Sequence, residues 1–253
     1  MGLLDRKTAV ITGANSGIGL ATAARFLAEG AERVFITGRR QSELDTAASK
    51  LGSRATAVPG DVGIPHDLDR LYAEVASAGK GLDIVMANAG ATRVAPLGEI
   101  TDDDLDALLT TNVKGVVHTV QKALPLLNNG ASIILTGSTT ADRGRTGLSI
   151  YAATKAAVRS LARAWANELA DRNIRVNVIV AGSTATPGSN ALAVQTDPDA
   201  SIEEFRADRI ATIPLGRFAE PIEIANAAVF LASDLSSFTT GSTVTADGGF
   251  NQV

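Results

Sequence analysis

The sequence predicts an α/β fold, a doubly wound sheet of about seven parallel strands flanked by helices, built by residues 1–253 as a single domain. Short apolar runs alternate with longer helical patterns along all 253 residues, which is typical of a parallel sheet with helices on both faces. The strand-like runs are apolar at nearly every position, as expected for strands buried on both sides. No shift in composition marks a second domain.

The expected strands are short runs rich in β-branched residues. They lie at residues 8–12, 33–37, 56–58, 82–87, 132–136, 175–180 and 243–246. Helical patterns between them lie at residues 18–29, 42–51, about 67–77 and about 152–170, with further helices after Thr101 and at Pro221. Right-handed crossovers between successive strands then give a Rossmann-type arrangement.

Local signals place several segment ends. Gly30 and Gly52 follow helical patterns and end them. Thr101 is expected to be an N-cap, because three aspartates follow it and negative charge is favourable in the first turn of a helix. Residues 187–199 are rich in Gly, Ser, Asn, Asp and Pro, which predicts an irregular loop. We expect a substrate lid at about residues 187–208.

Composition excludes several classes of function. The chain has no cysteine and only two histidines, so thiolate catalysis, disulfides, iron–sulfur clusters and three-histidine metal sites are ruled out, and we expect no metal. The 23 basic and 27 acidic residues are spread along the chain and give a net charge of −4, so no nucleic acid partner is expected. Without a run of ~20 apolar residues or an apolar signal core, we expect a cytoplasmic protein that binds no membrane.

The first expected strand runs into a glycine-rich turn, residues 12–19 (TGANSGIG), which opens a helix. Glycines let the backbone turn sharply and approach a pyrophosphate, whose charge is stabilised by the helix N-terminus. The spacing is GxxxGxG rather than the common GxGxxG. This turn favours a dinucleotide site, and a glycine-rich turn without a ligand is the alternative.

Two arginines, Arg39 and Arg40, follow the second expected strand, where the adenosine ribose of a dinucleotide is expected. An acidic residue at this place usually binds the ribose 2′-hydroxyl of NAD, whereas arginine suits a 2′-phosphate because its planar fork donates two parallel hydrogen bonds. No acid stands here. The pair therefore favours NADP(H), and two solvated arginines after a strand are the alternative.

Tyr151 and Lys155 form the third signal. They are four residues apart in a helical pattern, so their side chains share one face of the helix. A tyrosine with a pKa of about 10 is a poor base at neutral pH, but a nearby cation favours the phenolate and lowers the pKa. Ser138 follows the fifth expected strand, and its hydroxyl can bind a substrate oxygen at the carboxyl edge of the sheet.

Taken together, these motifs resemble the short-chain dehydrogenase/reductase family, and the resemblance runs nearly end to end. It is carried by residues 12–19, Asp61-Val62, Ala87-Asn88-Ala89-Gly90, Asn112, Ser138, Tyr151 with Lys155, residues 182–187 and Asp247-Gly248-Gly249. The resemblance implies a catalytic set of Asn112, Ser138, Tyr151 and Lys155. Tyr151 would be the general acid or base, Lys155 would lower its pKa, Ser138 would polarise the substrate oxygen, and Asn112 would anchor a water of a proton relay.

The resemblance also implies a set of cofactor-binding residues. Asp61 would accept a hydrogen bond from the adenine amino group, and Ile18 would donate its backbone N–H to the pyrophosphate. Thr184 and Thr186 would hold the carboxamide group of the nicotinamide. The full implied set is Gly13, Asn15, Ser16, Gly17, Ile18, Gly19, Arg39, Arg40, Asp61, Val62, Asn88, Gly90, Tyr151, Lys155, Gly182, Thr184 and Thr186.

The chain departs from the family pattern at several positions. Ala87 replaces the first Asn of the usual Asn-Asn-Ala-Gly, and Ala181 replaces the usual Pro before Gly182, so a fixed φ angle is lost. Thr184 stands where an apolar residue is common, which predicts a more polar pocket. Ser16 stands where many NADP-using members have a basic residue, which leaves most of the 2′-phosphate contact to the two arginines after the second strand.

The leading hypothesis is an NADP(H)-dependent oxidoreductase that interconverts a carbonyl and a secondary alcohol, with Tyr151 moving the proton. One alternative is an NAD(H)-dependent enzyme of the same class, and another is a catalytically silent dinucleotide-binding sensor or scaffold. The expected partner is a small carbonyl or alcohol substrate, and the sequence does not indicate which one. The resemblance implies a homotetramer, and Ala152, Ala153, Ala156 and Ala157 would permit close helix packing.

Overall fold

Seven parallel strands pair into one sheet in the computed structural model, which describes residues 2–253. Met1, the first residue of the predicted domain, lies outside the described residues. The strand order is β3-β2-β1-β4-β5-β6-β7. The strands are β1 (Thr8–Thr12), β2 (Arg33–Gly38), β3 (Ala55–Pro59), β4 (Leu82–Ala87), β5 (Leu127–Ser138), β6 (Arg175–Ala181) and β7 (Thr243–Ala246). The predicted doubly wound, Rossmann-type sheet is confirmed.

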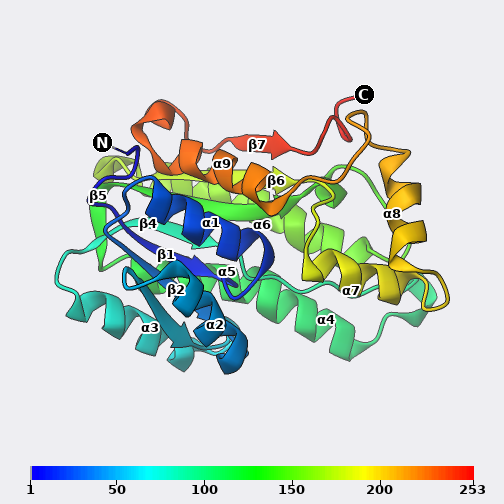
Figure 1. Cartoon of the computed structure of the whole chain (residues 1–253), viewed down its shortest axis with the longest axis horizontal. Helices are drawn as coiled ribbons and strands as arrows, with labels where there is room; N and C mark the ends of the chain where they lie inside the picture. Colours follow the sequence, from blue (N-terminus) through cyan, green and yellow to red (C-terminus); the bar gives the residue numbers. More distant parts are fainter. Residues whose placement is uncertain (1) are drawn as a thin grey trace.

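Helices connect the strands and cover the sheet (Figure 1). They are α1 (Gly17–Ala28), α2 (Gln41–Leu51), α3 (Pro65–Ser77), α4 (Asp102–Leu109), α5 (Gly115–Ala123), α6 (Ser149–Glu168), α7 (Pro187–Thr196), α8 (Ile202–Ile210) and α9 (Pro221–Ala232). A π-helical turn, Thr110–Lys114, joins α4 to α5. No helix within residues 2–253 combines the length and apolarity that crossing a membrane requires.

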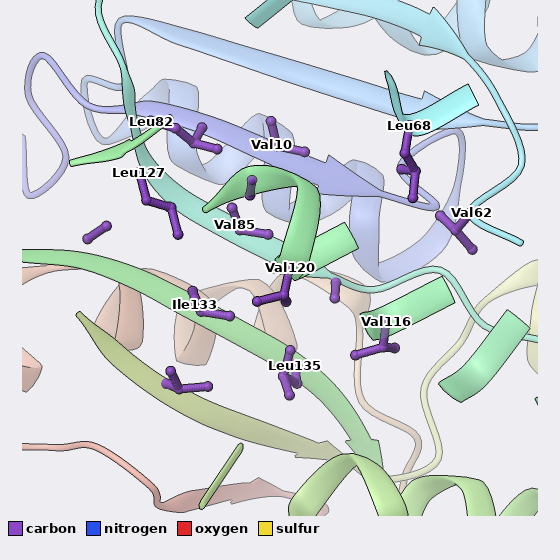
Figure 2. Close-up of a cluster of buried hydrophobic side chains, with 14 of the residues drawn as sticks. Val10, Val62, Leu68, Leu82, Val85, Val116, Val120, Leu127, Ile133 and Leu135 are labelled. Carbon is purple, nitrogen blue, oxygen red and sulfur yellow. The ribbon is translucent and has the colours of Figure 1, made fainter. Parts of the chain in front are cut away.

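The core forms two layers, one on each face of the sheet, because successive strand residues point in opposite directions. Val10 and Ile133 belong to the cluster under α3, α5 and α6, together with Leu68 and Val120 (Figure 2). Their chain neighbours, such as Ile11 and Ile134, belong to the cluster under α1, α2 and α9. The apolar strand runs of the sequence are thus buried from both sides.

The strand order places a crevice at a defined point of the sheet. From β1 the chain proceeds outward to β2 and β3, and it then returns to β4 on the other side of β1. Ligands of open α/β sheets bind at the carboxyl ends of the strands beside such a reversal. The arrow of β7 points toward this edge, where α7 and α8 lie (Figure 1).

The prediction of an irregular loop at residues 187–199 is wrong, because Pro187–Thr196 is the helix α7. Thr186 caps this helix by accepting a hydrogen bond from the backbone N–H of Ser189, and Pro187 stands in its first turn. Proline is favourable there because the first turn needs no N–H from it. The Thr-Pro start signal outweighs a composition that otherwise suits a loop. The predicted N-cap at Thr101 is confirmed, and Asp104 completes a capping box with it.

Candidate active site

A cavity of about 550 Å³ opens at the carboxyl ends of the strands. Loops after β1, β2, β3, β4, β5 and β6 line it, together with residues of α6, α7 and α8. All but two of the residues predicted for the site lie in its wall, and the two exceptions are Gly19 and Asn112. The predicted residues that line the cavity are Gly13, Asn15, Ser16, Gly17, Ile18, Arg39, Arg40, Asp61, Val62, Asn88, Gly90, Ser138, Tyr151, Lys155, Gly182, Thr184 and Thr186.

The glycine-rich turn after β1 forms one wall of the cavity. Gly13 has a φ of +63°, and a Cβ atom there would lie 2.8 Å from the Cα of Ala89. Gly19 faces inward instead, since its Cβ would lie 2.5 Å from the carbonyl oxygen of Gly13. Gly13 therefore serves the shape of the turn, and Gly19 serves the packing of α1 beneath it.

Asn88 ties this turn to the neighbouring strand β4. Its side-chain amide donates to the carbonyl oxygens of Thr12 (3.0 Å) and Gly13 (3.2 Å). Its backbone N–H and that of Ala89 both donate to the Thr12 hydroxyl at 3.0 Å. These four hydrogen bonds fix the two loops on either side of the sheet reversal. The replacement at Ala87 leaves this network intact.

Both arginines after β2 have acidic neighbours. Arg40 donates to the carboxylate of Glu43 at 2.6 Å, and Asn15 donates to the same oxygen at 2.7 Å. The hydrogen bond from Arg40 lowers the pKa of Glu43. Arg39 lies 3.9 Å from a carboxylate oxygen of Asp61, and its side chain is 66% exposed. Of the two cations, Arg39 is thus held less closely by its acidic neighbour.

Ser138 ends β5 and presents its hydroxyl to the cavity. Its oxygen accepts hydrogen bonds from the backbone N–H (3.3 Å) and the hydroxyl (2.9 Å) of Thr140. Because both contacts use the oxygen as an acceptor, the Ser138 hydroxyl keeps its own proton for another partner. This arrangement suits a hydrogen bond to a substrate carbonyl oxygen.

Tyr151 stands in the first turn of α6, beside Ser138 in the cavity wall. Burial raises the pKa of its phenol, and hydrogen bonds with Ser138 and Thr92 act in the opposite direction and lower it. The net pKa lies above its usual value of 10. The lowering expected from Lys155 is therefore not seen here: burial sets the direction of the shift, and the groups that oppose it are Ser138 and Thr92. At neutral pH the phenol carries its proton.

Lys155 is one helical turn farther along α6, and it is buried with 4% of its surface exposed. Its ammonium lies 5.7 Å from the centroid of the Tyr151 ring and donates to the carbonyl oxygen of Thr136 at 2.8 Å. Burial lowers the pKa of Lys155 to about 8. The expected juxtaposition of phenol and ammonium on one helix face is present.

Asn112 lies in the π-helical turn and is completely buried. Its carbonyl oxygen accepts from the N–H of Ala91 (2.8 Å), and its amide donates to the carbonyl oxygen of Ala91 (2.9 Å) and to the hydroxyl of Thr154 (3.1 Å). The side chain therefore clamps the loop after β4 to α6. Both sides of the active site depend on this one amide.

The loop after β6 also lines the cavity. Gly182 cannot carry a side chain, because a Cβ atom would lie 2.5 Å from the Cα of Asp247. The Thr184 hydroxyl donates to the carbonyl oxygen of Gly182 at 3.0 Å and is buried. Its polarity is thus satisfied within the loop, which reduces the extra polarity predicted for the pocket. The Thr186 hydroxyl oxygen serves as the cap of α7.

The chain is similar to known oxidoreductases over nearly its whole length. A family model described as Enoyl-(Acyl carrier protein) reductase matches residues 13–251. The chain is 48% identical to oxidoreductase asL5 of Sarocladium schorii, over 99% of this chain and 98% of that protein. It is 37% identical to the 3-oxoacyl-(acyl-carrier-protein) reductase FabG of Thermotoga maritima, over 97% of this chain and 98% of the other.

A solved structure from Brucella melitensis, described as a short-chain dehydrogenase/reductase (glucose/ribitol dehydrogenase), superposes with a TM-score of 0.91. It is 32% identical and covers 100% of this chain and 99% of its own. The chain belongs to the short-chain dehydrogenase/reductase family. The resemblance stated from the sequence is confirmed, and the protein is an oxidoreductase of this family.

Short-chain dehydrogenases/reductases use a nicotinamide dinucleotide cofactor, and this cavity fits one. Gly13 and Gly17 have φ angles of +63° and +56°, so the turn after β1 leaves its backbone open to the cavity. Ser16 is the N-cap of α1, and its side chain makes no capping hydrogen bond. The N–H groups of the first turn are thus open to a phosphate.

Thr92, Thr140 and Glu43 are among the residues of this dehydrogenase/reductase site that were not predicted. Thr92 and Thr140 contact Tyr151 and Ser138, and Glu43 pairs with Arg40. Glu43 follows Arg40 by three residues, which is the spacing of a side-chain pair on a helix, and Thr140 follows Ser138 by two, a spacing at which a serine hydroxyl commonly bonds the backbone N–H. Thr92 carries no local signal, because only the packing of the β4 loop against α6 brings it to the phenol.

Proposed function

We propose that this protein is an NADP(H)-dependent carbonyl reductase, which interconverts a carbonyl compound and a secondary alcohol. The single observation that carries the proposal is the placement of Tyr151 and Ser138 side by side in the wall of a cavity that also contains the glycine-rich turn. The phenol and the hydroxyl can then address one substrate oxygen. A cavity of about 550 Å³ is within the size range of small-molecule sites.

The chain's own residues supply the proton chemistry. The Ser138 hydroxyl donates a hydrogen bond to the carbonyl oxygen, which polarises the carbon–oxygen bond. The Tyr151 phenol then transfers its proton to that oxygen as the carbonyl becomes an alcohol. The pKa of the phenol is raised by burial, so the form present at neutral pH carries the proton that carbonyl reduction consumes. When bound, the reduced nicotinamide supplies the hydride for the carbonyl carbon.

The buried Lys155 is proposed to support this step. In the reverse direction, the phenol must lose its proton before it can accept one from an alcohol. A phenolate is favoured by the ammonium 5.7 Å from the ring centroid. Lys155 therefore acts on the proton affinity of Tyr151 rather than on the substrate.

Cofactor choice rests on the two arginines after β2. Arg39 is mostly exposed and 3.9 Å from Asp61, so it can turn to a 2′-phosphate at little cost. A second candidate, an NAD(H)-dependent reductase, is favoured by the pairing of Arg40 with Glu43. That carboxylate weakens the positive field at the expected 2′-phosphate position. Comparison of kcat/KM for NADPH and NADH distinguishes the two.

The catalytic proposal is tested by Tyr151→Phe, with Tyr72→Phe as a matched control. These are the two tyrosines of the chain, and both are buried or half-buried. Tyr72 donates to the carbonyl oxygen of Thr119, away from the cavity. We expect Tyr151→Phe to lower kcat at least ~100-fold without changing the Kd for NADPH, while Tyr72→Phe keeps its kcat. Equal kcat in Tyr151→Phe and the natural protein would refute the mechanism.

We also propose that the protein forms a homotetramer through α6. Ala153 and Ala156 are exposed on this helix, and Ala152 and Ala157 are half-buried, so a second helix can approach closely. Light scattering after gel filtration tests this proposal. The natural protein is expected at four times the chain mass, and Ala153→Glu is expected to produce a smaller species.

A further inference from the structure

Arg145 and Arg209 line the same cavity as Ser138 and Tyr151. Arg145 lies in the segment between these two residues along the chain, and Arg209 projects from α8. Neither arginine belongs to the turn after β1 or to the end of β2, where the phosphates of a dinucleotide are expected. They therefore bring positive charge to the substrate side of the cavity.

Both guanidinium groups are held by aromatic rings but lack polar partners. Arg145 lies 5.0 Å from the ring centroid of Phe250, and Arg209 lies 4.9 Å from that of Phe205. Within residues 2–253, neither guanidinium makes a hydrogen bond or an ion pair with another residue. Stacking uses the faces of the groups and leaves their N–H edges free to donate.

Two neighbouring arginines show the contrast. Arg143 also lies over the ring of Phe250, at 4.5 Å, but it donates to the carbonyl oxygen of that residue at 2.9 Å. Arg206 lies over Phe218 and donates to the side chain of Asn190 at 3.0 Å. Neither of them lines the cavity. Arg143 and Arg206 are thus fixed by hydrogen bonds to protein groups, whereas Arg145 and Arg209 are not.

The charge of the cavity wall is one-sided. Among the described residues, Asp61 is the only acid in the wall, and it faces Arg39 at 3.9 Å. Arg209 is half-buried, and desolvation lowers its pKa. A partly desolvated cation without a counter-ion is unfavourable, and an anionic ligand would relieve that cost.

Apolar residues line the same cavity as the two arginines. They are Leu148, Leu192 of α7, Phe205 of α8 and Phe218. They provide a surface for the carbon body of a substrate, between the reacting carbonyl at Ser138 and a charged end.

We propose that the substrate is an anionic carbonyl compound with an apolar body, whose carboxylate or phosphate group binds to Arg145 and Arg209. This inference rests on the proposed carbonyl reduction and names its substrate class. Arginine is suited to both anions because its fork donates paired hydrogen bonds to two oxygens. The anion fixes one end of the molecule, and the distance to Ser138 then selects the position of the carbonyl.

The test compares matched ketones with NADPH as reductant. The probes are levulinic acid and its longer straight-chain homologues, their methyl esters, and ketone phosphate esters of similar length. We expect acids or phosphates to exceed the esters in kcat/KM by about tenfold or more, as hydrogen bonds to charged groups imply. Whichever of the two series, carboxylates or phosphates, has the larger kcat/KM identifies the anion that the site binds. Esters that are reduced as well as both anionic series would overturn the inference while leaving carbonyl reduction intact.

Variants then assign the preference to the two arginines. Arg145→Gln and Arg209→Gln are each expected to lower the ratio of anion to ester kcat/KM about tenfold, with the Kd for NADPH unchanged. The matched controls Arg143→Gln and Arg206→Gln should keep that ratio. A higher Kd for NADPH with an unchanged ratio would show that these arginines bind the cofactor instead. The comparison of probes on the natural protein stands even where a variant does not fold.

A binding measurement separates this inference from the proposed reaction. Calorimetry with hexanoate and with hexanol needs no turnover. We expect hexanoate to bind the NADP⁺-saturated protein, and the double variant Arg145→Gln/Arg209→Gln to lose that binding. Equal affinity for hexanoate and hexanol would overturn the inference. Hexanoate binding without reduction of any ketone would instead count against the proposed function alone.

Discussion

The ammonium of Lys155 lies 5.7 Å from the ring centroid of Tyr151 and donates to the carbonyl oxygen of Thr136 rather than to the phenol. The side chain is buried, and its pKa falls from 10.5 to about 8. The fold thus holds a desolvated cation beside the proposed proton donor. A buried charge of this kind lowers the stability of the protein. The role of Lys155 in the proposed mechanism accounts for its presence despite that cost.

Lys155→Met is therefore expected to stabilise the protein at neutral pH while it lowers turnover. A fall in pKa from 10.5 to about 8 corresponds to about 3 kcal/mol of lost stability at pH 7. Loss of the hydrogen bond to Thr136 offsets part of the gain, so we expect about 1–2 kcal/mol. Denaturant unfolding of the natural protein and the variant at pH 7 measures the difference.

The pH dependence of this difference has a definite sign. Between pH 8 and 10.5 the unfolded chain binds a proton at Lys155 that the folded chain does not, so the folded state gains stability as pH rises. The advantage of the methionine variant should be full below pH 8 and shrink toward pH 10. A difference that stays constant over this range would show that burial of the charge is not its cause.

Glu43→Gln is expected to strengthen NADPH binding. Glu43 accepts hydrogen bonds from Arg40 and Asn15, and its removal as an anion frees Arg40 for a 2′-phosphate. Because the groups are exposed, the effect is modest, about a threefold lower KM for NADPH. The KM for NADH should not fall with it. Glu223→Gln, which breaks the exposed pair with Arg217 away from the cavity, is the control.

Thr92→Val tests a positioning residue. The hydrogen bond between Thr92 and Tyr151 lowers the pKa of the phenol, so its loss should raise that pKa further. Alcohol oxidation with NADP⁺ then requires a higher pH, and kcat/KM at pH 8 should fall about three- to tenfold. The pH profile should shift upward, which a purely structural defect would not cause. Thr92→Ser keeps the hydroxyl and should restore the profile.

The fold was readable from the sequence because each strand is short, apolar and bounded by a strong signal. The bounds of β1, β4 and β7 match the predicted runs. The error at α7 has a local origin, since composition was weighed above the Thr186-Pro187 start signal. β5 begins five residues before the predicted strand, at Leu127, because pairing with Leu82 of β4 extends it through polar residues. Pairing with a neighbouring strand cannot be predicted from the apolar residues of one strand alone.

The site was predictable where chemistry follows a motif. The glycine-rich turn, Ser138, Tyr151 and Lys155 all meet in one cavity, as their spacing indicated. Contacts between distant segments were not predictable, such as the one between Thr92 and Tyr151. The direction of the Tyr151 pKa was also missed, because the shift is set by burial of the phenol, which depends on the packed structure.

Asn112 provides the last prediction. Asn112→Ala would leave the N–H and the carbonyl of Ala91 without partners in a buried site, at a cost of about 2–5 kcal/mol. For a chain of this size, this corresponds to a Tm lower by roughly 5–15 °C. Turnover should fall as well, because Ala91 adjoins Thr92, which contacts Tyr151. Thr154→Val removes one partner of Asn112 together with the hydrogen bond from the Thr154 hydroxyl to the backbone carbonyl of Tyr151 within α6, and it should lower the Tm by a few degrees with most of the turnover retained. Equal effects of the two variants would show that the clamp on Ala91 is not what holds the active-site loop.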